Sequence, residues 1–158
     1  MALIIEDGSG VANANSYITA DDWDTWATAR GISHTHSDSH IEEFILTAMD
    51  YFEALSFIGR KATDEQELQW PRTEVYIDSY SVDSDEIPKQ VKNALYEITR
   101  TVADGNFALS ARERQTTQEK IGDITVTYKN NASMRKETPA VTSALRKITK
   151  SVNAVSRS

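Results

Sequence analysis

The apolar residues of this chain recur at helical spacing in two long stretches. The first stretch carries Ile41, Phe44, Ile45, Ala48, Phe52 and Leu55. The second carries Ile87, Val91, Ala94, Leu95, Ile98 and Val102. Residues three or four positions apart lie on one side of an α-helix, so each stripe predicts an amphipathic helix with one face in a core. Ser39 with Glu42 predicts a capping box for the first helix, and Pro88 predicts the first turn of the second.

A shorter helix and an aromatic anchor accompany these two stripes. Thr19 predicts the N-cap of a helix that places two tryptophans on one face and ends at Gly31, which suits a left-handed C-cap. Between the long helices, Pro71 fixes its own φ and pushes Trp70 out of the α region. Trp70 is therefore predicted in the core, where it sets how the two long helices face each other.

The segments around the anchor are predicted to be short or irregular. Residues 3–5 are apolar and predict an edge strand closed by a turn at residues 7–10. Residues 63–67 predict a single helical turn. Residues 73–87 are acidic and rich in serine and tyrosine, which predicts a surface loop.

The polarity pattern changes after the second long helix. Residues 116–129 predict a β-hairpin, because Gly122-Asp123 suits a two-residue type II′ turn and places Ile121 opposite Ile124. The same register pairs Glu119 with Val126, Lys120 with Thr125 and Gln118 with Thr127. A ribbon with so little apolar surface is marginal alone, so we expect it to lean on another surface.

A last helix is predicted to begin at Thr138-Pro139, after a polar linker. It carries an apolar stripe of Val141, Leu145, Ile148 and Val152. The stripe is compatible with either of two alternatives, docking on the chain's own core or docking on a partner. Together the patterns predict a mainly α fold, a small helical bundle of about four helices with one β-hairpin and a C-terminal docking helix. We expect a single domain over residues 1–158, divided into a helical core (1–110), the β-hairpin (111–130), and the linker with the C-terminal helix (131–158).

Composition and charge narrow the classes of protein. Cysteine is absent, which excludes disulfides, thiolate catalysis and cysteine-based zinc sites. The longest apolar runs are too short for a membrane span or a secretory leader, so we expect assembly in the cytosol. The formal net charge is -7, but residues 1–86 carry 4 Lys/Arg against 18 Asp/Glu, whereas residues 87–158 carry 13 against 6. This asymmetry is compatible with nucleic-acid binding, with head-to-tail stacking of subunits, and with two unevenly solvated surfaces.

Candidate chemistry is sparse. The three histidines His34, His36 and His40 lie beside Asp38, but in a serine-rich loop without the defined scaffold that zinc ligands need, so a solvated loop is favoured over a metal site. Residues 7–10 lack the Gly-Lys-Ser/Thr of a phosphate loop. Carboxylates are plentiful but stand in polar runs, so no catalytic residue, cofactor or enzymatic activity is predicted.

The order of several short motifs carries a resemblance. They are Ala2-Leu3-Ile4-Ile5-Glu6-Asp7-Gly8-Ser9-Gly10, Ala14-Asn15-Ser16-Tyr17, Ala48-Met49-Asp50-Tyr51, Trp70-Pro71-Arg72, Ile87-Pro88, Lys120-Ile121-Gly122, Ile124-Thr125-Val126-Thr127-Tyr128 and Pro139-Ala140-Val141. Over nearly its whole length the chain resembles a family of small tailed-phage and prophage proteins, often labelled DnaT-like single-stranded-DNA-binding proteins. That family is also similar to the head-to-tail adaptor, connector or neck proteins of tailed phages.

The resemblance implies, as the leading interpretation, a structural virion protein. It would be one subunit of a head-to-tail adaptor ring that joins the portal to the tail and forms part of the DNA conduit during genome ejection. The implied partners are further copies of the chain, in a homo-oligomeric ring of about twelve subunits, the portal protein, and a tail or stopper protein. DNA would pass without specific binding, no membrane would be involved, and the protein would lie in the virion neck after assembly in the host cytoplasm. The candidate interface residues are Arg72, Ile124, Val126, Tyr128, Met134, Arg135, Val141, Leu145, Arg146 and Ile148.

The alternative is a DnaT-like single-stranded-DNA-binding protein that acts in phage replication. Such a protein needs a basic groove with stacking aromatic rings, and Tyr128, Lys129, Arg135 and Lys136 would form a small one. The tryptophans lie in apolar contexts and the net charge is negative, so the sequence favours the adaptor.

Overall fold

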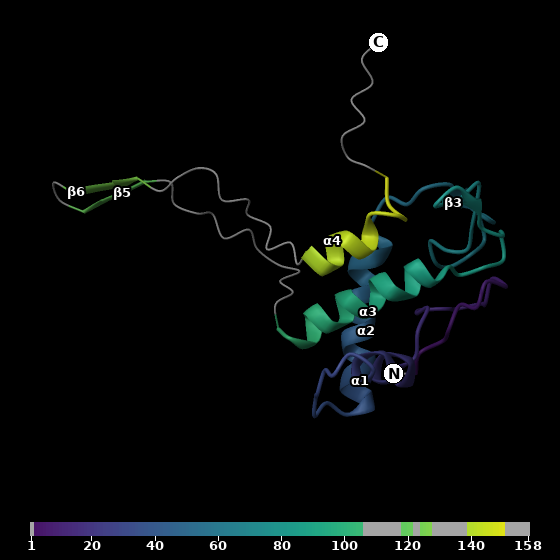
Figure 1. The fold of residues 1–158 in the computed structure, drawn as a ribbon, viewed down its shortest axis with the longest axis horizontal. Coiled ribbons are helices and arrows are strands. Elements are labelled where there is room, and N and C mark those ends of the chain that lie inside the picture. The colour runs from purple at the N-terminus through teal and green to yellow at the C-terminus, as the bar shows by residue number, and fades with distance from the viewer. Residues whose placement is uncertain (1, 106–117, 122–123, 128–138, 151–158) are drawn as a thin grey trace, which may run out of the picture.

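The computed structural model describes residues 2–105, 118–121, 124–127 and 139–150. Within them it contains the helices α1 (Ala20–Thr28), α2 (Asp38–Glu53), α3 (Lys89–Ala103) and α4 (Pro139–Leu145). Short antiparallel strands pair as β1 (Arg60–Lys61) with β2 (Arg72–Thr73), β3 (Tyr76–Ile77) with β4 (Tyr80–Ser81), and β5 (Gln118–Ile121) with β6 (Ile124–Thr127). Helix predominates, which confirms the mainly α prediction (Figure 1). None of the helices in these ranges is long and apolar enough to cross a membrane.

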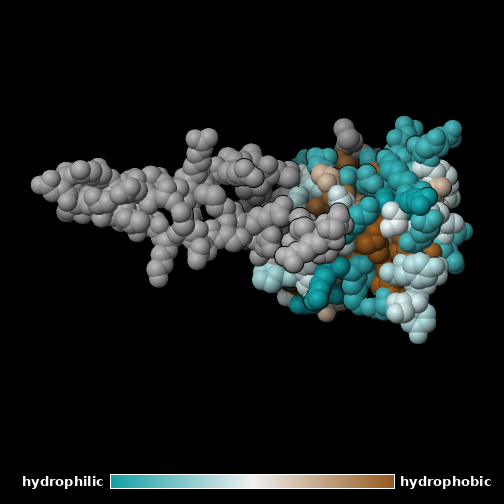
Figure 2. All heavy atoms as spheres, turned by 90° about the horizontal axis from the view of Figure 1, so that it is seen from above, coloured by the Kyte–Doolittle hydropathy of each residue, from teal (hydrophilic) through white to brown (hydrophobic). Residues whose placement is uncertain are grey.

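The core forms where α3 packs against both α2 and α4 (Figure 1). The fully buried side chains include Ile41, Ile45 and Phe52 of α2, Leu95 and Ile98 of α3, and Ile148 just beyond α4. Each such side chain stabilises the fold by about 1.5–3 kcal/mol relative to an exposed one. Both long stripes are thus confirmed in their central parts, whereas Phe44, Leu55 and Val102 are only partly buried and Leu55 lies beyond the end of α2. Seen from above, most of the described surface is hydrophilic (Figure 2).

The start of α1 follows the predicted capping. The Thr19 hydroxyl accepts the Asp22 N–H at 3.0 Å, while the Asp22 carboxylate accepts the Thr19 N–H at 2.9 Å. The two bonds form a capping box that satisfies backbone donors at the start of the helix. Trp23 and Trp26 of α1 are buried, and Gly31 has a φ of 69° shortly after the helix ends, as predicted.

The starts of α2 and α3 differ from the prediction by a few residues. The capping box of Ser39 with Glu42 is wrong, because α2 already begins at Asp38. Ser39 therefore lies inside the first turn, where its hydroxyl hydrogen-bonds with the Ser37 hydroxyl at 3.0 Å. Pro88 occupies the N-cap of α3 with an extended backbone and not its first turn.

The last helix is shorter than predicted and docks on the chain's own core. α4 ends at Leu145, yet Val141, Leu145 and Ile148 are all buried. Beyond the helix, residues 148–150 pair with residues 56–58 through an antiparallel bridge and two backbone hydrogen bonds of 3.1 and 2.9 Å. These bonds satisfy backbone groups that further helical turns would otherwise have paired.

Trp70 is fully buried, as predicted, and a polar network holds its backbone. The Tyr17 hydroxyl donates to Glu53 Oε1 at 2.8 Å and accepts the Trp70 N–H at 3.0 Å. The second carboxylate oxygen of Glu53 accepts the Gln69 N–H at 2.7 Å. Burial raises the pKa of the Glu53 carboxyl and, more strongly, the pKa of the Tyr17 hydroxyl. The network ties the end of α2 to the backbone just before Pro71.

Two of the short predicted elements do not form. Residues 63–67 make no helical turn, because the buried Gln66 side chain hydrogen-bonds with backbone groups on both sides of it. Residues 3–5 make a single bridge instead of a strand. The turn at residues 7–10 is confirmed, and the buried Glu6 carboxylate explains it by accepting three backbone N–H groups at 2.8 to 2.9 Å.

The prediction for residues 73–87 is wrong in part. This segment is not only a surface loop, since it contains the β3–β4 hairpin and buries Val75, Ile77 and Ile87. By contrast, the predicted register of the later hairpin is confirmed for β5 and β6, where Gln118 pairs with Thr127, Glu119 with Val126, Lys120 with Thr125 and Ile121 with Ile124. Its turn at 122–123 lies outside the described residues.

Candidate functional site

The β3–β4 hairpin exposes two tyrosine side chains. Its turn residues Asp78 and Ser79 have φ of 52° and 73°, and positive φ at both central positions is the type I′ geometry that suits a two-residue hairpin. Ile77 anchors the hairpin in the core, whereas Tyr76 and Tyr80 are 66% and 78% exposed. The hairpin therefore holds two phenol rings in solvent on a defined backbone.

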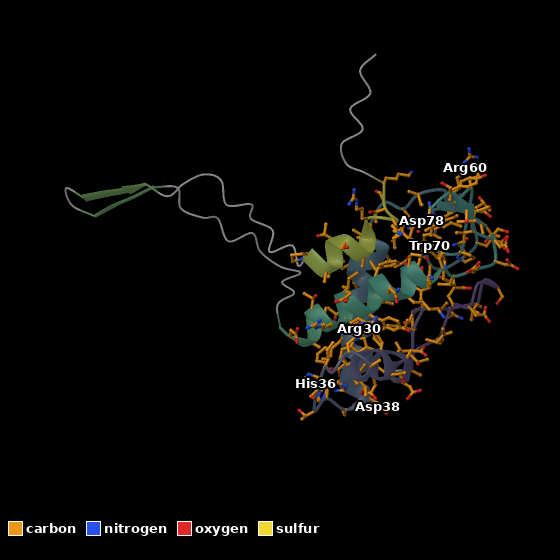
Figure 3. The ribbon with its side chains drawn as sticks, in the orientation of Figure 1. Arg30, His36, Asp38, Arg60, Trp70 and Asp78 are labelled. Atoms are coloured by element: carbon orange, nitrogen blue, oxygen red, sulfur yellow. The ribbon has the colours of Figure 1, made fainter. Side chains whose placement is uncertain are left out.

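The segment just beyond α4 brings one basic side chain, Lys147, to this hairpin. Lys147 Nζ donates to Asp78 Oδ2 at 2.6 Å, and Figure 3 shows Asp78 beside the end of α4. Arg146 and Lys150 are also exposed, and residues 139–150 contain no acidic residue. We name this the tyrosine–α4 surface, which consists of Tyr76, Tyr80, Arg146, Lys147 and Lys150.

The ion pairs in this region are exposed and exchangeable. The Lys147 and Asp78 side chains are 53% and 60% exposed. Near them, Arg60 Nε lies 3.2 Å from Glu74 Oε2, again with both side chains exposed (Figure 3). Exposed pairs of this kind contribute about 0.2–1 kcal/mol, so a phosphate group can replace the carboxylate at small cost.

A pocket of about 330 Å³ lies at the C-terminal end of α3. The rings of Trp23, His34 and His36 line it, with centroids 5.0 Å apart for Trp23–His34 and 5.8 Å apart for His34–His36. From α3 it is lined by Arg100 and Asp104, whose Nε and Oδ2 atoms lie 3.8 Å apart. The pocket therefore combines ring faces with one cation and one anion.

The histidine-rich segment is more ordered than the predicted solvated loop. His34 Nε2 lies 2.8 Å from Asp24 Oδ1, and His36 packs edge-on against Phe44 with ring centroids 5.0 Å apart. His40 lies in α2 and hydrogen-bonds with the Ser37 hydroxyl at 3.2 Å. Within the described ranges, no group of three or more His, Asp or Glu side chains is arranged to hold a metal ion.

Arg72, a predicted interface residue, is buried and fully engaged inside the chain. Its guanidinium donates to the carbonyl oxygens of Ile58, Gly59 and Gln69 at 2.7 to 3.1 Å, and to the Gln69 side-chain oxygen at 3.1 Å. Burial lowers the pKa of Arg72, while Tyr17 and Glu53 act in the opposite sense. These contacts make Arg72 a part of the scaffold around Trp70.

The other predicted interface residues fall into three groups. Val141, Leu145 and Ile148 are buried against the chain's own core. Arg146 is exposed and belongs to the tyrosine–α4 surface. Ile124 and Val126 lie in β6, whose side chains are not described, and Tyr128, Met134 and Arg135 lie outside the described residues together with the basic groove predicted around Tyr128. An interface role for these five stays a prediction.

The sequence interpretation missed Tyr76, Tyr80 and Lys147 as site residues. A signal for the tyrosines was present, because Asp78-Ser79 is a turn pair flanked by aromatic and β-branched residues. No local signal places Lys147 beside Asp78, since 69 positions separate them in the chain.

Comparison with known proteins gives one finding. A family model described as "Putative DnaT-like ssDNA binding protein" matches residues 1–158. Neither the curated proteins nor the solved structures contain a match to the chain. The match confirms the resemblance to the DnaT-like family over the whole chain.

The same match overturns the leading interpretation from the sequence. The head-to-tail adaptor is wrong as the leading function, and its virion and neck roles find no support, because the family that spans the whole chain is described as a DNA-binding one. The negative net charge and the apolar contexts of the tryptophans counted against DNA binding in that interpretation, but a basic C-terminal part can attract phosphates locally. The ring, the portal and tail partners and the virion location were implied only by the adaptor and have not been tested.

Proposed function

Because the chain belongs to the family of DnaT-like single-stranded-DNA-binding proteins, we propose that it binds single-stranded DNA through the tyrosine–α4 surface. The observation that carries this proposal is the exposure of Tyr76 and Tyr80 on a hairpin whose turn residue Asp78 binds Lys147, just beyond α4. Proteins hold single strands by stacking bases on aromatic rings and by pairing phosphates with cations. The tyrosine–α4 surface supplies both kinds of group.

The chemistry of the surface favours single strands over duplex. Stacking on a phenol ring needs a free base face, which a duplex conceals between neighbouring base pairs. Every base has such a face, so stacking discriminates little between sequences. We therefore expect binding with weak sequence preference. No chemical step is part of the proposal, and no cofactor is needed for stacking.

The overall charge of -7 sets how the binding depends on salt. The negative charge repels DNA at long range, whereas Arg146, Lys147 and Lys150 attract phosphates locally. If these three cations neutralise three phosphates, the logarithm of the binding constant falls with the logarithm of salt concentration with a slope of about -2.

The first test measures binding of the full chain to a fluorescently labelled poly-dT oligonucleotide of about 16 nucleotides by anisotropy at low salt. Replacing both tyrosines (Tyr76→Ala with Tyr80→Ala) should weaken binding about tenfold or more, because each stacked base contributes about 1–3 kcal/mol. Lys147→Gln should weaken binding less and make the salt slope shallower.

Two controls keep this test specific. Tyr76→Phe with Tyr80→Phe retains both rings and should bind like the original chain. Arg30→Gln removes an exposed cation that lies away from Asp78 (Figure 3) and should leave affinity nearly unchanged. If the original chain shows no salt-dependent binding at low salt, the proposed function is wrong.

A further inference from the structure

We infer that the pocket at the C-terminal end of α3 receives one nucleotide of the bound single strand, with its base against the histidine rings and its phosphate on Arg100. This inference rests on the proposed function and adds a second contact site to it. The pocket lies apart from the tyrosine–α4 surface: Figure 3 shows His36 and Asp78 toward opposite ends of α3.

The size and lining of the pocket suit a nucleotide. Its volume of about 330 Å³ falls within the range of sites that bind small molecules, about 300–1,000 Å³. Trp23, His34 and His36 form a continuous series of ring contacts along it. His34 and His36 are nearly parallel, with an angle of 13° between their ring planes, so they present similarly oriented faces. A planar base can stack on such rings as it does on other aromatic side chains.

The side chains of Arg100 and Asp104 supply the polar contacts to the proposed nucleotide. Arg100 and Asp104 are about half exposed, and their closest atoms are 3.8 Å apart, which is a loose ion pair. Such a pair contributes little to stability, so each partner is available to a ligand. Asp104 can accept a hydrogen bond from an amino or imino group of a base. Arg100 can donate to the adjoining phosphate.

A basic stripe on α3 connects the pocket with the rest of the surface. Lys89, Lys92 and Arg100 recur at spacings of three and eight residues, which places them on one side of the helix. None of the three is buried. α3 spans about 22 Å, so a strand of a few nucleotides that follows this stripe passes from the hairpin end of α3 to the pocket end.

Because the chain contains three histidines, NMR can follow the imidazole signal of each one separately. In protein with isotope-labelled histidine, addition of the poly-dT oligonucleotide should shift the imidazole NMR signals of His34 and His36. The signal of His40, which does not line the pocket, should stay in place. If DNA binds and the signals of His34 and His36 do not move, the pocket is not a DNA site.

Two substitutions test the same inference by affinity. His36→Ala and Arg100→Gln should each weaken oligonucleotide binding about fivefold to tenfold, whereas His40→Ala should not. Arg100 is exposed, so its replacement should leave the fold intact, and thermal unfolding checks this for all three variants. Absence of binding by the original chain overturns both proposals. Binding that depends on Tyr76 and Tyr80 but not on His36 or Arg100 overturns the pocket alone.

Discussion

Glu53 shows how strongly burial acts on a single residue of this protein. Its carboxylate accepts hydrogen bonds from Tyr17 and Gln69, and Lys61 and Arg72 lie close enough to favour the charged form. The pKa of Glu53 is nevertheless raised, because the loss of hydration outweighs these contacts. The sequence interpretation treated the carboxylates as solvated, since nothing in a linear pattern shows that Tyr17 and Gln69 contact this one in a partly buried site.

The raised pKa of Glu53 gives the first stability prediction. A carboxyl group with a raised folded pKa binds its proton more tightly in the folded state, so its contribution is fully present below the ordinary value of 4.5 and is lost as pH rises through the folded pKa. We expect the free energy of unfolding of the original chain, relative to Glu53→Gln, to fall as pH increases above 4.5. Urea unfolding of both proteins at several pH values measures this difference. A difference that rises with pH would contradict the proposed environment of Glu53.

At the scale of elements, the local sequence predicts where the helices form, but not which distant segments pair with their ends. The stripes of α2 and α3 were predictable because apolar residues repeat with the helical period. The register of β5 and β6 was predictable because the Gly122-Asp123 sequence favours a two-residue turn. The end of α4 was not, since residues 148–150 leave the helix to pair with residues 56–58, far away in the sequence.

The position of α4 gives the next stability prediction. Leu145→Asp should destabilise the fold by about 4 kcal/mol or more, because it removes a buried side chain and places a carboxylate among apolar groups of the core. The proposed DNA binding should be lost in parallel, since α4 positions the basic side chains of Arg146, Lys147 and Lys150, which follow it in the chain. Ala140→Asp introduces the same charge at an exposed position of the same helix and should be nearly neutral. Unfolding of Leu145→Asp at the same urea concentration as the original chain would show that α4 is not part of the core.

At the scale of the whole molecule, an ion pair joins the acidic and basic parts of the chain beside the β3–β4 hairpin. Lys147 comes from the basic part, Asp78 from the acidic part, and their ion pair places a negative charge within the tyrosine–α4 surface. Under the proposed function, Asp78 would compete with phosphate for Lys147 and limit the affinity for DNA. The sequence showed the charge asymmetry, but only the fold shows where the two parts touch.

The last prediction concerns this competition. Asp78→Asn should tighten oligonucleotide binding by up to about fivefold, because it releases Lys147 from a pair that contributes about 1 kcal/mol at most. Asp50→Asn removes the same charge at an exposed position of α2, outside both proposed contact sites, and should have a smaller effect. Anisotropy titrations of both variants at one salt concentration make the comparison. Equal effects would mean that only the overall charge matters.

The pairing of residues 148–150 with residues 56–58 also affects when folding can finish during synthesis of the chain. The ribosome makes the N-terminal part first, so the tyrosine hairpin leaves the ribosome well before α4 is synthesised. Until then the core lacks Ile148 and the hairpin lacks its basic neighbours. Residues 139–150 thus close the core and add the cations in one step. Under the proposed function, a growing chain would reach its full affinity for DNA only after this step.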